Sequence, residues 1–159
     1  MSFPAIDTIP ADNTDAISAA LGQTPQSIWH GRYSATEFDY MAVFESADQI
    51  VSLQPEATAF NNLGSRGIVA TAPGNDCDFV SRYFAPAAGI PEDPVTGSTH
   101  CLMAPWWASK LDKKSLAARQ LSARTGTLQC EVLEDRVTLT GRAIDYLAGT
   151  ISLPDSTAV

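Results

Sequence analysis

The stretch from Gly89 to Trp107 joins a turn of acids, prolines and small residues to the most apolar helical pattern in the chain. Its large apolar side chains recur at helical spacing: Leu102, Met103, Trp106 and Trp107, with Leu111 continuing the stripe. We therefore expect the main helix over residues 96–111, with Pro105 forfeiting one backbone hydrogen bond inside it and kinking it. A helix with this much apolar surface must be covered by other elements.

Short strand patterns flank this helix in the sequence. Before it, we expect an entering strand or extended lead over 1–9, helices over 15–21, 46–51 and 55–63, and strands over 27–33, 38–45, 67–72 and 78–85. After it, apolar and polar residues alternate over 120–124, 126–133, 136–140 and 143–153, as in an antiparallel meander. Many short strands around one apolar helix predict an α+β fold in which the sheet covers the helix.

Length and charge limit the classes of protein and partner. A chain of 159 residues predicts a single domain over 1–159. The net charge is −8 and no cluster of Lys or Arg occurs, which argues against nucleic acid or an anionic membrane surface as a partner. The sequence lacks a signal-peptide pattern and any apolar run of membrane-spanning length, so we expect a cytoplasmic protein.

The cysteine pattern and the known nucleotide motifs give no support for a cofactor. Cys77, Cys101 and Cys130 are odd in number and lack CxxC spacing, which fits neither a disulfide framework nor a zinc site. The sequence has no Walker loop, no GxGxxG and no His/Cys cluster with metal-ligand spacing. We therefore expect no metal and no cofactor.

The start of the main helix has two possible registers. With Thr96 as N-cap, the backbone N–H groups of the next three residues stay free at the helix end, where anions bind: Gly97, Ser98 and Thr99. With Asp93 as N-cap and Pro94 in the first helical position, the turn is only a well-formed helix start. The residue types alone leave both registers open.

Several side chains around this turn could carry chemistry or could be structural. Asp93 and Glu92 are adjacent carboxylates, either a general base or solvated loop acids. Ser98 and Thr99 could bind an anion or close the first turn, and His100 could move protons or pack. In the same way, Cys101 is either a nucleophile or a small buried hydrophobe, and Arg82 and Arg124 bind a ligand carboxylate or pair with an acid of the chain.

Several segments together resemble one protein family. They are Arg82–Pro86, Gly89–His100, Trp106–Leu111, Gln120–Gly126, Arg136–Ala143 and the opening Phe3–Ala5. They are similar to the PhzF-like phenazine-biosynthesis family, which belongs to the diaminopimelate-epimerase-like superfamily of cofactor-independent isomerases. The run Glu92-Asp93-Pro94-Val95-Thr96-Gly97-Ser98-Thr99-His100 is the most specific part of the match.

The resemblance implies a fold and a set of site residues. Family members are roughly twice as long and have two similar lobes, each a sheet wrapped around a central helix, with the site between them; this chain resembles the C-terminal lobe alone. Asp93 corresponds to the family's active-site Asp, and Gly97 and Ser98 to the turn that holds a substrate carboxylate, which selects Thr96 as the N-cap. The resemblance thus predicts Asp93 and Ser98 as catalytic residues, and a substrate-binding set of Thr96, Gly97, Ser98 and Thr99.

The resemblance also assigns the principal acid–base Glu and a supporting His to the other lobe, which this chain lacks. Three hypotheses follow. The chain is an isomerase for a small carboxylic acid whose second lobe comes from a homodimer mate or another polypeptide. Alternatively, it is a binding module for a small carboxylate, or a half-gene product that folds and dimerises without chemistry.

Overall fold

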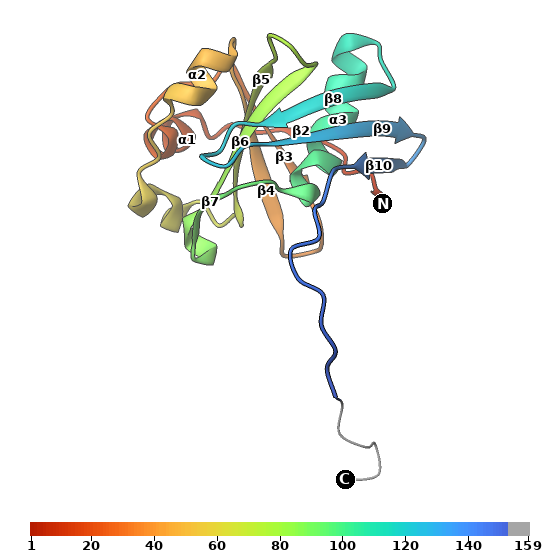
Figure 1. Ribbon diagram of the computed structural model, residues 1–159. Coiled ribbons are helices and arrows are strands. Elements are labelled where there is room, and N and C mark those ends of the chain that lie inside the picture. Colours follow the sequence, from red (N-terminus) through yellow and green to blue (C-terminus); the bar gives the residue numbers. More distant parts are fainter. Residues whose placement is uncertain (153–159) are drawn as a thin grey trace.

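The computed structural model describes residues 1–152, in which the strands form one mixed sheet (Figure 1). The strands are β1 (Ser2–Pro4), β2 (Ile9–Pro10), β3 (Ser27–Arg32), β4 (Phe38–Val43), β5 (Gly67–Pro73), β6 (Phe79–Ala85), β7 (Ile90–Asp93), β8 (Ser115–Gln120), β9 (Gly126–Leu133) and β10 (Arg136–Thr140). Their order across the sheet is β1-β10-β9-β8-β6-β5-β4-β3-β2, and β7 pairs with β6 beside this path.

Helices connect these strands. They are α1 (Thr14–Leu21), α2 (Ala47–Ser52), α3 (Gly97–Leu111) and the 3₁₀ turns η1 (Ala57–Asn62) and η2 (Pro86–Ala88). Gly22 ends α1 with a φ of 74°, a left-handed conformation that favours glycine, and its N–H bonds to the Ser18 carbonyl. Ser46 caps α2, because its side chain accepts a hydrogen bond from the backbone N–H of Gln49.

Two pairs of neighbouring strands are parallel, β4 with β5 and β6 with β8, and the other neighbouring pairs are antiparallel. A parallel pair needs a crossover connection, since the chain must return to the same end of the sheet. The connection from β6 to β8 contains β7 and α3. This crossover therefore brings the turn before α3 close to the end of β8.

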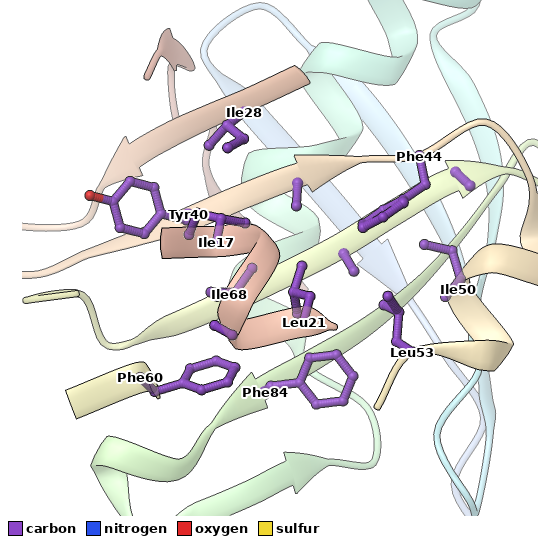
Figure 2. Packing of buried hydrophobic residues seen from close by; sticks show 14 of the residues in the cluster. Ile17, Leu21, Ile28, Tyr40, Phe44, Ile50, Leu53, Phe60, Ile68 and Phe84 are labelled. Carbon is purple, nitrogen blue, oxygen red and sulfur yellow. The ribbon is translucent and has the colours of Figure 1, made fainter. Parts of the chain in front are cut away.

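The central strands β4, β5 and β6 are buried on both faces of the sheet. On one face α1, α2 and η1 cover a cluster whose large side chains include Ile17, Leu21, Phe44, Phe60 and Phe84 (Figure 2). On the other face α3 packs into a second cluster, to which it contributes Cys101, Leu102, Met103, Ala104 and Trp107. Alternate residues of β6 serve the two clusters, Phe79 and Tyr83 on the α3 side and Val80 and Phe84 on the other. The predicted α+β class with a central helix is confirmed.

Pro105 lies inside α3, which continues through it to Leu111. Because proline has no backbone N–H, the carbonyl of Cys101, four residues earlier, lacks its helical donor. The N–H of Ile6 donates to that carbonyl at 2.9 Å. The proline thus leaves one helix carbonyl free to accept a hydrogen bond, which holds the segment between β1 and β2 against the helix.

Some predicted boundaries were wrong. The strand expected over 120–124 lies instead over 115–120, where Leu116, Ala118 and Gln120 alternate inward, and residues after Gln120 turn back toward β9. The helix expected over 55–63 is the 3₁₀ turn η1, and the lead expected over 1–9 divides into β1 and β2. Small alanines in β8 weaken the contrast between apolar and polar positions on which a strand prediction depends.

The strand predicted over 143–153 is not formed in its described part, since residues 141–152 have no regular structure, and residue 153 lies outside the described residues. Both edges of β10 are already occupied, by β9 and by β1, so this segment has no neighbour to pair with there. It leads away from the sheet (Figure 1), and its large apolar side chains are 82–100% exposed: Ile144, Tyr146, Leu147 and Ile151. Within residues 1–152 no helix is both long and apolar enough to cross a membrane.

Candidate functional site

The N-terminus of α3 presents free backbone donors. The helix begins at Gly97 with Thr96 as N-cap, so the first of the two predicted registers is the one adopted, and Asp93 instead ends β7. Thr96 has an extended backbone and its side chain makes no capping hydrogen bond. Among residues 1–152, no acceptor takes the N–H groups of Gly97, Ser98 or Thr99. These groups and the helix dipole favour an anion at this end.

A cavity of about 520 Å³ opens at this helix end. Gly97, Ser98 and Cys101 line it from α3, and Tyr33 lines it from the connection after β3. The rest of its wall is mostly apolar and comes from Met1, Phe3, Pro4, Ile6, Val95, Leu128, Leu139 and Gly141. A ligand with a carboxylate at the helix end and an apolar body along this wall matches the chemistry of the cavity.

The predicted site residues are divided between the cavity and the turn behind it. Gly97 and Ser98 are exposed and line the cavity. Thr96 and Thr99 are buried, and the Thr99 hydroxyl donates to the Thr96 carbonyl at 3.1 Å, closing the first turn. Asp93 is half-buried and does not line the cavity; its Oδ2 accepts from the Thr96 hydroxyl at 2.6 Å. The structure thus brings the predicted residues into one turn but places only two of them at the cavity wall.

Two side chains, one at the end of β8 and one in the turn after it, hold the turn before α3 by hydrogen bonds. The buried amide of Gln120 accepts from the Thr96 N–H at 2.9 Å and donates to the Asp93 carbonyl at 2.7 Å and to the Thr96 hydroxyl at 3.1 Å. The Ser122 hydroxyl donates to the Pro94 carbonyl at 2.8 Å. Both residues lie in a segment that resembles the family, but neither could be assigned this role from the sequence, since their contacts depend on the parallel pairing of β6 with β8.

The two charged candidates beside Asp93 are used structurally. Glu92 receives two hydrogen bonds from the Arg82 guanidinium, at 2.7 and 2.9 Å. The remaining Arg82 nitrogen donates to carbonyls at the end of α2, those of Ile50, Val51 and Leu53, at 3.1–3.3 Å. The pair therefore fastens β7 to α2 and leaves neither group free for a ligand. Arg124 lies exposed in the turn between β8 and β9.

His100 and Cys101 are packing residues of α3. His100 is fully buried, its Nδ1 lies 2.7 Å from the Thr96 carbonyl, and burial lowers the pKa of its imidazole to about 4. A neutral ring with that contact carries its proton on Nδ1, which leaves Nε2, unpartnered among residues 1–152, as a buried acceptor. Burial also raises the pKa of the Cys101 thiol, so it stays protonated. Neither group is prepared for proton transfer or nucleophilic attack at neutral pH.

A buried ionic cluster, which the sequence patterns did not reveal, supports the Tyr33 side of the cavity. The fully buried Asp39 carboxylate accepts from Arg66 at 2.7 and 3.3 Å and from the Tyr83 hydroxyl at 3.0 Å. The Arg66 guanidinium lies 3.9 Å from the centre of the Tyr33 ring. Burial and the Asp39 charge raise the pKa of both tyrosines. A β-carbon at Gly67 would come within 2.4 Å of the Phe84 carbonyl, so only glycine fits beside this cluster.

The signal that could have pointed to this cluster is Asp39 itself, an acid in an otherwise apolar strand pattern, because buried carboxylates need partners. The residues of the cluster are 17 or more positions from one another except for Tyr33 and Asp39, and only the sheet register brings them together. As for metals, nowhere in residues 1–152 do three His, Cys, Asp or Glu side chains gather so as to hold an ion.

Comparison with known proteins places the chain in a family. The model of the family described as phenazine biosynthesis-like protein matches residues 1–149. An uncharacterized isomerase of Pseudomonas aeruginosa is 40% identical over 153 residues, which cover 96% of this chain and 57% of the relative. The mouse phenazine biosynthesis-like domain-containing protein 2 is 36% identical over 170 residues, covering 96% and 58% respectively.

Solved structures agree in fold. A crystal structure of a putative phenazine biosynthesis PhzC/PhzF protein from Clostridium difficile superimposes with a TM-score of 0.83 at 36% identity, covering 96% of this chain and 57% of that one. A PhzF-family protein from Enterococcus faecalis gives a TM-score of 0.73 at 33% identity, covering 90% and 55%. The chain therefore spans little more than half the length of the relatives it matches, and with these matches it belongs to the phenazine biosynthesis-like (PhzC/PhzF) family.

Proposed function

We propose that this chain is the carboxylate-holding lobe of a PhzF-like isomerase that acts on a small carboxylic acid by cofactor-independent proton transfer. The observation that carries this proposal is the N-terminus of α3, where N–H groups without acceptors within residues 1–152 meet the cavity at Gly97 and Ser98. These donors and the Ser98 hydroxyl bind the substrate carboxylate, since an anion there gains both hydrogen bonds and the helix dipole. The backbone of Thr96 and Thr99 shapes the turn.

Asp93 supplies one of the two groups that proton transfer at carbon requires. A base takes a proton from one face of the carbon and an acid returns it on the other face or elsewhere. Asp93 lies at the end of β7, three residues before the helix cap. The complementary acid–base group comes from a second lobe, given by a homodimer mate or another polypeptide. In a homodimer, two Asp93 turns face each other across a cleft.

The exposed apolar side chains of segment 141–152 are a second argument for a complementary lobe. Its apolar side chains, among them Tyr146 at 100% exposure and Ile144 at 94%, have no cover within the described residues, although the family model extends to residue 149. Exposed apolar side chains in such a run mark a contact surface. The chain leaves the sheet beside the cavity, because Gly141 and Met1 both line it and Met1 bonds to Leu139. A second lobe that packs against this segment lies next to the same cavity.

The alternative is a small-carboxylate-binding module without turnover. One observation favours it: Asp93 is outside the cavity wall and one of its carboxylate oxygens is already bonded to Thr96. A module of this kind would keep the helix-end donors and bind the same acids without exchanging their protons.

Solvent deuterium incorporation separates the two functions. The full chain is incubated in D₂O with a panel of small carboxylic acids that carry a C–H beside the carboxylate, and the products are read by mass spectrometry. Exchange by the wild type that falls by a factor of about 10²–10⁴ in Asp93→Asn supports the isomerase. Thermal stabilisation by an acid without exchange supports the binding module, and equal exchange by both proteins contradicts the role of Asp93.

A further inference from the structure

The geometry points to Gln120 as a positioning residue that acts through Thr96 to fix which oxygen of Asp93 exchanges a proton. We infer that Oδ2 of Asp93 is held as a hydrogen-bond acceptor and that Oδ1 is the proton-carrying atom. Proton transfer at Oδ1 rests on the proposed function, whereas the hydrogen-bond directions rest on the contacts alone and can be tested without any ligand.

Two backbone groups determine the orientation of the Gln120 amide. Its Oε1 lies 2.9 Å from the backbone N of Thr96, which can only donate. Its Nε2 lies 2.7 Å from the backbone carbonyl of Asp93, which can only accept. A flipped amide would set Nε2 against the Thr96 N–H, donor against donor, and Oε1 against the Asp93 carbonyl, acceptor against acceptor. Both hydrogen bonds would be lost in a buried site. The amide nitrogen therefore faces β7 and the oxygen faces the helix cap.

The direction of the next hydrogen bond follows from the inventory of donors. The same Nε2 lies 3.1 Å from the Thr96 hydroxyl oxygen, and an amide nitrogen has no lone pair to offer. Thr96 Oγ1 must therefore accept at this contact. Its single hydrogen is then left for its other neighbour, Oδ2 of Asp93, at 2.6 Å. That distance is typical of a hydroxyl donating to a carboxylate.

The consequence falls on the carboxylate of Asp93. A proton on Oδ2 would collide with the hydroxyl hydrogen of Thr96, and among residues 1–152 that hydrogen has no second acceptor to which it could turn. Oδ1 has no donor among residues 1–152. A proton taken by Asp93 from the substrate carbon therefore goes to Oδ1, and the C–H electron pair stays on the substrate. A Glu at position 120 would instead set an acceptor against the Asp93 carbonyl, which explains an amide at this buried position.

The test uses nuclear magnetic resonance of the full chain without ligand, in the wild type and in Thr96→Val, with Thr96→Ser as the matched control that keeps the hydroxyl. In Thr96→Val, one side-chain proton of Gln120 loses its acceptor. We expect its resonance to move and its exchange with solvent to become about tenfold faster, because the loss of one hydrogen bond of ordinary strength lowers the free energy of opening by an amount that corresponds to about that factor. The carboxyl carbon resonance of Asp93 should move as well. Thr96→Ser should leave both unchanged.

Asp93→Asn gives a second, less disruptive test. If Thr96 donates to the atom at Oδ2, the Asn carbonyl oxygen takes that place and its NH₂ group takes the place of Oδ1. The new NH₂ resonances then exchange at the rate of an unprotected amide. Strong protection of this NH₂ group, or Gln120 and Asp93 resonances that do not respond to Thr96→Val, would overturn the inference. Absence of deuterium transfer by the wild type, with these hydrogen-bond results as expected, would refute only the proposed function.

Discussion

Protonation of His100 at low pH should lower the free energy of unfolding of the fold around the site. The imidazole of this α3 residue is fully buried beside the Phe79 ring, and burial lowers its pKa from 6.5 to about 4. The unfolded chain binds a proton at His100 below about pH 6.5, whereas the folded protein binds one only near pH 4. Stability from this residue is therefore fully present above pH 6.5 and is lost as the pH falls toward 4.

The expected loss is about 3 kcal/mol, since one pKa unit corresponds to ~1.4 kcal/mol. The assay is urea unfolding at half-unit steps from pH 7 to pH 4, in the wild type and in His100→Asn. Asn keeps a side-chain N–H for the Thr96 carbonyl but does not titrate. Its packing differs, so the variant starts from a lower free energy of unfolding.

The predicted quantity is the change in the free energy of unfolding with pH, and not its value at pH 7. Both proteins keep every other titrating group, so the difference between their curves isolates His100. The free energy of unfolding of the wild type should approach that of His100→Asn as the pH falls from 6.5 to 4. If the two curves stay parallel through this interval, the imidazole is not held neutral by burial and the reasoning is refuted.

Substitutions at three positions test other parts of the account. Arg66→Met should lower the free energy of unfolding by about 3 kcal/mol in urea, because it leaves the buried Asp39 carboxylate without its cation, and Arg66→Lys should recover part of the loss. Gly126→Ala should lower Tm by about 3–10 °C, since a β-carbon would lie 2.2 Å from Val95 and overpack the turn. Gly97→Ala is its control: the nearest side-chain atom would be 3.9 Å away, so a comparable drop in Tm would contradict this reading of both glycines.

Local patterns were enough to predict much of the fold. The apolar stripe of α3, the strand over 78–85 and the helix over 15–21 each depend on neighbours in sequence, and the structure has α3, β6 and α1 at these positions to within one residue. Errors arose where the outcome depends on distant residues. The segment after Gly141 alternates like a strand, yet β1, from the other end of the chain, occupies the edge of β10 that β9 does not.

The residues of the candidate site also divide into those that local sequence features indicate and those that depend on distant parts of the chain. Gly97 and Ser98 could be singled out from the sequence because a helix cap and its free N–H groups are local features. The resemblance, not the residue pattern, chose Thr96 as the cap over Asp93. Gln120 could not be given a role, because its contact with Thr96 is created by the crossover that pairs β8 with β6. The same holds for Asp39 in β4 and Arg66, the residue before β5, which the pairing of these two strands brings together.

The central claim is that the N-terminus of α3 holds a carboxylate. The most direct test is a titration of the ¹⁵N-labelled chain with benzoate, whose apolar ring suits the cavity wall, and with benzamide, a neutral molecule of the same shape. The account predicts saturable shifts of the Gly97, Ser98 and Thr99 amide resonances with benzoate and much weaker shifts with benzamide. Equal responses to the two molecules, or shifts confined to residues outside the first turn of α3, would contradict it.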